Sequence, residues 1–195
     1  AIVGNPQAFP EVKEAATVLA TNVRSLRNGE GELPAAPASV QDTIEPLLPL
    51  VDRAERNANQ VLGQQKTLTQ VGQALQAVNR QTSAPLQTAE GISLIKLQQE
   101  ASASELSAAG QLVMLTQRIG KSANEFLTAD GASAQAIELL GRDLASFRAI
   151  AQGLQDGSGE LRLPPARDPQ LRASLATLLK QYEETRAQAA PILDN

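Results

Sequence analysis

The chain has 195 residues, 42% of them hydrophobic but only 2% aromatic, and its formal net charge is −4 at pH 7. It contains no cysteine and no histidine, which excludes thiol catalysis, histidine-dependent triads and the usual zinc sites. The scarcity of aromatic residues indicates a core of Leu, Ile, Val and Ala, as in helical bundles, and the scattered basic residues argue against nucleic-acid binding.

Apolar residues recur at intervals of three and four along the first part of the chain. After a lead-in that holds Gly4, Pro6 and Pro10, the stripe over residues 12–26 predicts a helix that ends at Asn28-Gly29. A Pro-rich connection over residues 30–38 follows.

A second helix is predicted from about Ser39, which is a plausible N-cap. Pro46 and Pro49 should start this helix late or kink it, because each lacks a backbone donor. A further stripe continues past Gly63 to about Thr82, through Leu68, Val71, Leu75 and Val78.

The sequence Ser83-Ala84-Pro85 interrupts this pattern, and one long central helix is predicted over residues 86–128. The end of this helix is predicted at residues 129–131. Its apolar seam has the spacing of a helix in a coiled-coil-like bundle: Ala108, Leu112, Leu115, Ile119 and Phe126.

Two more helices follow. A stripe over residues 137–154 is stopped by Asp156-Gly157, and Pro169 opens the last helix behind an Asp168 N-cap. The buried face of that helix is marked by Leu171, Leu175, Leu178 and Tyr182. No strand-like alternation occurs, so the predicted fold class is all-α.

The chain contains an internal repeat. Each apolar position of the first stripe, shifted by 128 residues, falls on an apolar position of the stripe over residues 137–154. The following loops match as well, NGEGEL at 28–33 against DGSGEL at 156–161, and beyond a small insertion the shift becomes 131. Any two heptad helices align by chance, but the shared loop favours two tandem modules.

The repeat predicts elongated tandem helical bundles, made of two four-helix-type modules that are each incomplete at one end. Residues 1–84 form the first module, which lacks its first helix because the partner of the central helix would lie before residue 1. Residues 85–195 form the second, which lacks its last helix. No apolar run approaches the roughly 18 residues of a membrane span, and the chain begins at Ala1 rather than Met. We therefore expect a processed or excised part of a longer protein.

The stretch AGQLVMLTQRIGK at 109–121 resembles the signature helix of the type IV pili chemoreceptor, nitrate-sensor-like domain family. The chain matches that signature at Ala109, Gly110, Met114, Leu115, Thr116, Gln117, Arg118 and Ile119. The resemblance implies the periplasmic domain of a homodimeric inner-membrane receptor, with pilin or another periplasmic protein as its partner. No constellation of residues suggests catalysis, a cofactor or a metal site, so we do not expect an enzyme.

Two positions depart from the signature. Val113 stands where the family's nitrate binders have the Arg that precedes Met, and Gln111 stands at the preceding basic position. Nitrate recognition needs fixed cationic donors that face the anion. We therefore expect that this module does not bind nitrate in the family manner.

Five residues of this helix are candidates for contacts with a ligand or partner: Gln111, Met114, Gln117, Arg118 and Lys121. Arg118 and Lys121 can engage an acidic partner, or they can belong to an ordinary solvated face with Glu125. Met114 can instead fill the core or an interface. The two glutamines line a polar layer between helices or face water.

The sequence is compatible with three functions. The first is the sensing domain of a type IV pilus chemoreceptor that controls twitching motility, senses pilin and relays a helix displacement across the membrane. The second is a sensor of a small molecule or anion, with a pocket at a dimer interface. The third is a passive helical spacer.

Overall fold

The computed structural model describes residues 4–128 and 134–194. These residues form eight α-helices and one short 3₁₀-helix, and the two β-bridges among them are isolated, so the described chain is all-α as predicted. It divides into two compact units, Ala1–Gln70 and Val71–Asn195. None of the described helices is both long and apolar enough to cross a lipid bilayer. The helix end predicted at residues 129–131 lies outside the described residues.

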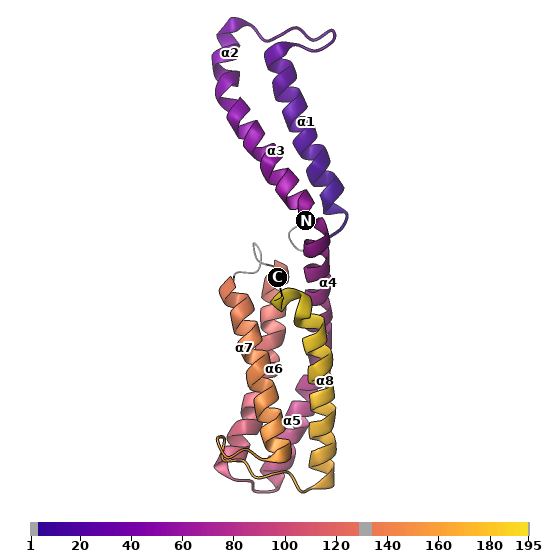
Figure 1. Ribbon diagram of the computed structural model, residues 1–195, viewed down its shortest axis with the longest axis vertical. Coiled ribbons are helices and arrows are strands. Elements are labelled where there is room, and N and C mark those ends of the chain that lie inside the picture. The colour runs from indigo at the N-terminus through magenta and orange to yellow at the C-terminus, as the bar shows by residue number, and fades with distance from the viewer. Residues whose placement is uncertain (1–3, 129–133, 195) are drawn as a thin grey trace. The chain divides into compact units, whose positions relative to one another are not determined.

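The first unit is built on one pair of helices. α1 (Ala8–Asn28) packs along α3 (Leu48–Gly63), and α2 (Ala38–Ile44) with η1 (Glu45–Leu47) leads into α3 (Figure 1). The buried apolar residues of this unit are few: Phe9, Ala20, Ile44 and Val51. α4 (Gln65–Gln81) starts in this unit and continues into the second.

Prolines break the segment between α1 and α3. Pro46 lies in η1 and Pro49 in the first turn of α3, which confirms the predicted interruption of this helix. The predicted N-cap at Ser39 is wrong. α2 already begins at Ala38, because the carbonyl of Pro37 accepts from the N–H groups of Val40 (2.8 Å) and of the next residue (3.2 Å).

The second unit contains a four-helix bundle. α5 (Ser83–Gln98), α6 (Ala103–Thr128), α7 (Ala134–Asp156) and α8 (Pro169–Leu193) form a closed cycle, in which each helix packs on the next and α8 returns to α5 (Figure 1). The predicted seam of α6 is confirmed, since all five of its side chains are buried. The predicted cap of α8 is also confirmed, because the Asp168 carboxylate accepts from the Gln170 N–H at 2.9 Å.

The prediction of one continuous helix over residues 86–128 is wrong. The chain leaves α5 at Gln98 and enters α6 at Ala103, and Glu100 between them has a left-handed φ of 50°. Ser102 and Glu105 form a reciprocal capping box: the Ser102 N–H donates to Glu105 Oε2 (3.0 Å), and the Glu105 N–H donates to Ser102 Oγ (3.4 Å). These bonds satisfy donors that a new helix leaves free, so the turn is stable here.

The loops after α1 and α7 begin in the same way, although Gly31 has a positive φ and its equivalent Gly159 does not. Gly29 (φ 76°) and Gly157 (φ 89°) end the two helices in the left-handed region, and they are 128 positions apart. Each loop then closes on an isolated antiparallel bridge, Glu30 with Leu33 and Ser158 with Leu163. This geometry supports the internal repeat. The assignment of residues 1–84 and 85–195 to two modules remains a prediction.

Candidate functional site

The predicted site residues lie on two sides of α6. Three of them, Met114, Gln117 and Lys121, continue a row that begins at Gly110, with spacings of four, three and four, and all four residues are exposed. They form the outer ridge of α6, on the side opposite its buried seam. The Met114 side chain is 47% exposed, so it lies on the surface rather than in the bundle core.

Arg118 lies on the side of α6 that faces α7. Its Nε donates to Asp143 Oδ2 at 2.8 Å, and its Nη2 donates to the other carboxylate oxygen. The Asp143 side chain is 3% exposed, whereas that of Arg118 is 43% exposed. The hydrogen bonds and the charge of Asp143 raise the pKa of Arg118 above its ordinary value. Arg118 therefore holds α6 to α7, and its bidentate donors are already occupied.

The other two candidates have weaker contacts. Lys121 Nζ lies 3.5 Å from Glu125 Oε1, one turn further along α6, and both side chains are well exposed. Such a surface pair contributes little and leaves the ammonium group accessible. Gln111 donates to Ser107 Oγ at 3.3 Å and lines a shallow surface hollow with Ile150 of α7.

Val113 is half-buried and packs against the bundle core. The position at which the sequence departs from the nitrate-binding signature is therefore apolar in its surroundings as well as in its side chain. Val113 therefore gives an anion no cationic donor at this position of α6.

The centre of the bundle holds a small cavity of about 20 Å³, to which all four helices contribute. Such a volume has room for about one water molecule. Three threonines line it, and each of their hydroxyls donates to a backbone carbonyl of its own segment: Thr82, Thr116 and Thr185. The rings of Phe147 and Tyr182 also line the cavity, and they stack on each other at a centroid distance of 5.6 Å. The cavity is too small for a metabolite.

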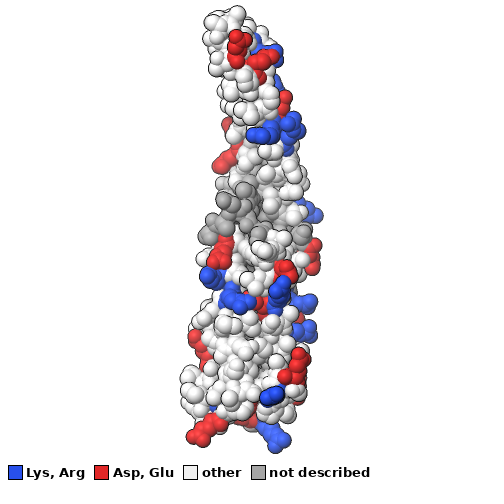
Figure 2. All heavy atoms as spheres, turned by 90° about the vertical axis from the view of Figure 1, so that its left-hand side faces the viewer, with Lys and Arg blue, Asp and Glu red and all other residues white. Residues whose placement is uncertain are grey.

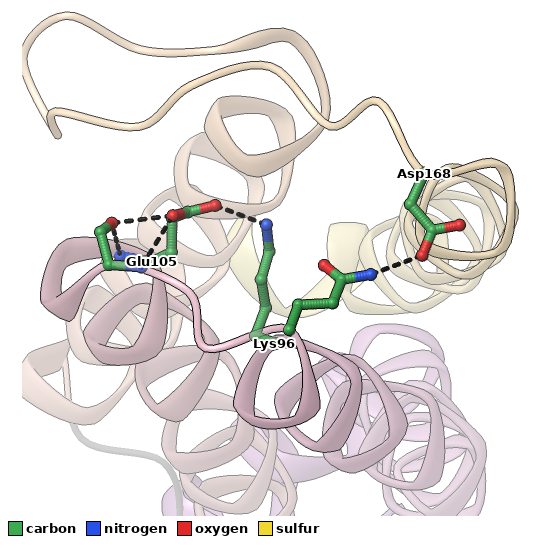
Figure 3. Close-up of polar contacts among 5 residues, drawn as sticks. Lys96, Glu105 and Asp168 are labelled. Carbon is green, nitrogen blue, oxygen red and sulfur yellow. Dashed lines mark hydrogen bonds and ion pairs between the residues drawn. The ribbon is translucent and has the colours of Figure 1, made fainter.

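A second charged pair lies near the turn between α5 and α6 (Figure 3). Lys96 Nζ donates to Glu105 Oε1 at 2.6 Å, and the two side chains are 5% and 13% exposed. Ser102 Oγ donates to the other oxygen of Glu105 at 2.8 Å. Beside it the side-chain amide of Gln99 donates to Asp168, the N-cap of α8. These contacts join α5, α6 and α8 at this end of the bundle.

Figure 2 shows one face of the molecule, on which basic and acidic side chains alternate in small groups between uncharged areas. Among the described residues visible in this view, charges of one sign do not form an extended patch. A partner that bound there would be recognised by mixed apolar and polar contacts rather than by a single strong field.

The sequence reasoning missed Asp143 and Lys96. Each charged residue stands where the spacing of three and four residues calls for an apolar one. Asp143 lies three residues after Leu140 and four before Phe147, and Lys96 lies four residues after Ile92. A charge at such a position is the signal that would have identified them. A buried charge must have a partner on a neighbouring helix, because isolating it from water is costly.

Comparison with known proteins gives two matches. The family model for the N-terminal part of type IV pili methyl-accepting chemotaxis transducers matches residues 1–77 and 96–195. The chain is also similar to Protein PilJ of Pseudomonas aeruginosa, with 25% identity over 197 aligned positions. These positions cover 100% of this chain but 29% of that protein, so the chain spans less than a third of the length of this curated relative.

Proposed function

Because this chain belongs to the N-terminal family of type IV pili methyl-accepting chemotaxis transducers, we propose that it is the periplasmic sensing domain of a type IV pilus chemoreceptor that controls twitching motility. Its input in this proposal is the pilin subunit, and its parent is a homodimeric receptor anchored in the inner membrane. The observation that carries the proposal is the signature helix α6, which lies at the surface of a closed bundle with its ridge exposed.

The ridge of α6 favours a protein over a small solute as the input. It combines the apolar Met114 with the polar Gln117 and the charged Lys121, and all three are exposed. A surface of this kind suits a protein partner, since methionine is enriched at protein interfaces. The cavity inside the bundle has room for only about one water molecule, and Val113 offers no donor to an anion.

Two buried charges support the relay of a displacement along the bundle. Arg118 ties α6 to Asp143 of α7, and Glu105 ties α6 to Lys96 of α5. Each pair has at least one side chain that is almost fully buried. If α5 or α7 slid along α6, a buried charge would therefore be separated from its partner or exposed to water. A displacement of α6 on partner binding is therefore shared by α5 and α7.

Binding of purified pilin to the 195-residue chain tests the proposal. Lys121→Glu reverses a charge on the ridge without touching the core, and we expect an affinity loss of about tenfold or more. Arg142→Glu on α7 is the matched control, because Arg142 is 70% exposed against 74% for Lys121 and likewise pairs with a glutamate one turn away. Equal affinities of the two variants would remove the ridge from the interface, and absence of pilin binding by the unchanged chain would overturn the proposal.

Nitrate tests the departure at Val113. We expect calorimetric titration of nitrate into the chain to show no binding at micromolar concentrations, since no cationic donor stands at this position. Micromolar binding would favour the small-anion sensor instead. A thermal-shift screen extends the test to other solutes, because a ligand at one hundred times its dissociation constant stabilises the folded state by about 2.7 kcal/mol.

A further inference from the structure

Some equivalent apolar positions are exposed in the first unit and buried in the second, whereas Ile44 and Val51 are buried like their equivalents Leu175 and Tyr182. Four large apolar residues of the first unit are 46%, 47%, 43% and 42% exposed: Leu19, Leu26, Val40 and Leu47. Their repeat equivalents are 2%, 0%, 1% and 0% exposed: Phe147, Leu154, Leu171 and Leu178. The first unit therefore has an apolar face of the kind that forms a bundle core, and the described residues leave it open. We call these four first-unit residues the open face.

The open face comes from α1, which carries Leu19 and Leu26, and from the segment leading into α3, which carries Val40 and Leu47. Leu19 and Leu26 are seven residues apart and so project from the same side of α1. Ion pairs also join α1 to the same segment: Arg24 reaches Asp52 (3.0 Å) and Glu55 of α3, and Arg27, next to Leu26, reaches Glu45 of η1 (2.9 Å). The four apolar side chains of the open face are 42–47% exposed in spite of these contacts between the helices.

The second unit shows what covers such a face. There α7 and α8 present the equivalent residues, α6 packs on α7, and α5 packs on α8. The covering helices contribute Ala, Leu and Ile at intervals of three and four, among them Ile92 of α5 and Leu112 of α6, which are both fully buried. Two antiparallel helices joined by the short turn between α5 and α6 therefore complete the core.

We propose that the open face binds a further helical hairpin of the same kind as α5–α6, supplied by the same polypeptide from outside the 195 residues. The face and the hairpin together close a second four-helix bundle. In the second unit the hairpin is supplied within the chain, immediately before α7. The curated relative is much longer than this chain, which covers 29% of it, so polypeptide outside the matched region is available in that protein.

Thiol labelling tests the proposal cleanly, because the chain has no cysteine of its own. Leu19→Cys and Leu47→Cys each place one thiol on the open face. We expect both thiols to react rapidly with a maleimide in the 195-residue chain. In the solubilised full-length gene product they should react more slowly by on the order of 100-fold, because labelling then requires local opening of the bundle.

Two further variants serve as controls. Glu14→Cys lies on an exposed part of α1 away from the open face and should react equally in both proteins. Ala151→Cys lies at a position that is 0% exposed and should be protected in both, which reports that the second unit is folded.

Two results would overturn the proposal. The first is equal labelling of Leu19→Cys and Leu47→Cys in the chain and in the full-length product. The second is labelling of the 195-residue chain that slows as its concentration rises, together with a dimer in sedimentation. That result would show that a second copy covers the open face.

Discussion

Two ion pairs with buried members join neighbouring helices of the second unit. Lys96 and Asp143 are almost fully buried, and each is met by a charge from a neighbouring helix, Glu105 and Arg118 respectively. A buried ion pair adds little net stability, but the loss of one partner leaves an uncompensated charge. We infer that the two pairs specify which helices face one another more than they stabilise the bundle.

Glu105→Gln is expected to destabilise the second unit by about 3 kcal/mol at pH 7, because the buried Lys96 ammonium loses its counter-charge. Urea unfolding followed by circular dichroism measures the loss. Glu183→Gln is the control: Glu183 and Arg148 are 3.8 Å apart and about half exposed, so the expected loss is below about 1 kcal/mol. Similar losses of stability in the two variants would show that the burial of Lys96 does not determine how much Glu105→Gln destabilises the unit.

The same residue predicts a sensitivity to acid. Burial raises the pKa of Glu105, but the hydrogen bonds from Lys96 and Ser102 outweigh burial and lower it below its ordinary value of 4.5. A carboxyl with a lowered folded-state pKa contributes stability that is present above the unfolded pKa and is lost as pH falls through the folded pKa. The stability difference between the unchanged chain and Glu105→Gln should thus be constant above about pH 5.5 and shrink below about pH 4.5. A constant difference down to pH 3 would contradict this.

At the scale of elements, α1 and α7 each end at a glycine, in a backbone conformation that a residue with a side chain would adopt only with strain. A Cβ on Gly29 would lie 2.8 Å from Ala35 N, and one on Gly157 would lie 3.1 Å from Pro165 Cδ. Both glycines also have positive φ. We expect Gly29→Ala and Gly157→Ala to cost about 1–3 kcal/mol each in urea unfolding, the former more because its added Cβ lies closer to backbone, 2.8 Å from Ala35 N against 3.2 Å from Pro165 N. Gly159→Ala, whose added Cβ meets nothing within 4 Å, should change stability by less than about 0.5 kcal/mol.

The periodicity of the sequence predicted which faces of the helices are apolar but not every place where a helix ends. The seam of α6 was predictable because one face needs burial at every third or fourth position. The turn between α5 and α6 was missed because apolar spacing continues on both sides of it. Ser102 and Glu105 do have the Ser-x-x-Glu spacing of a capping box, which is the signal that would have located the start of α6.

The chemistry of the site was predictable only in part, for two physical reasons. The charge of Asp143 interrupts an apolar seam, and its partner Arg118 lies 25 residues away on another helix, so no local pattern joins them. Burial is also a property of the assembled helices. Leu26 and Leu154 occupy equivalent positions with the same side chain, yet they are 47% and 0% exposed.

At the scale of the whole molecule, the two units differ in how much core each has. The large contiguous cluster of buried apolar residues runs from Ala74 to Ile192 and belongs to the second unit. The first unit buries Phe9, Ala20, Ile44 and Val51 and leaves its open face uncovered. Since buried apolar area is the main source of stability, the first unit should be the weaker of the two in the 195-residue chain.

We therefore expect two transitions when the chain unfolds in urea. Tyr182 is the one tyrosine of a sequence without tryptophan, and it stacks on Phe147, so tyrosine fluorescence reports the second unit alone. Circular dichroism reports both units and should lose part of its signal at lower urea than the fluorescence does. Gly29→Ala should move the earlier transition and Gly157→Ala the fluorescence transition. If both probes gave one coincident curve, and each substitution moved it equally, the two units would share one cooperative core, and the open face would not limit stability.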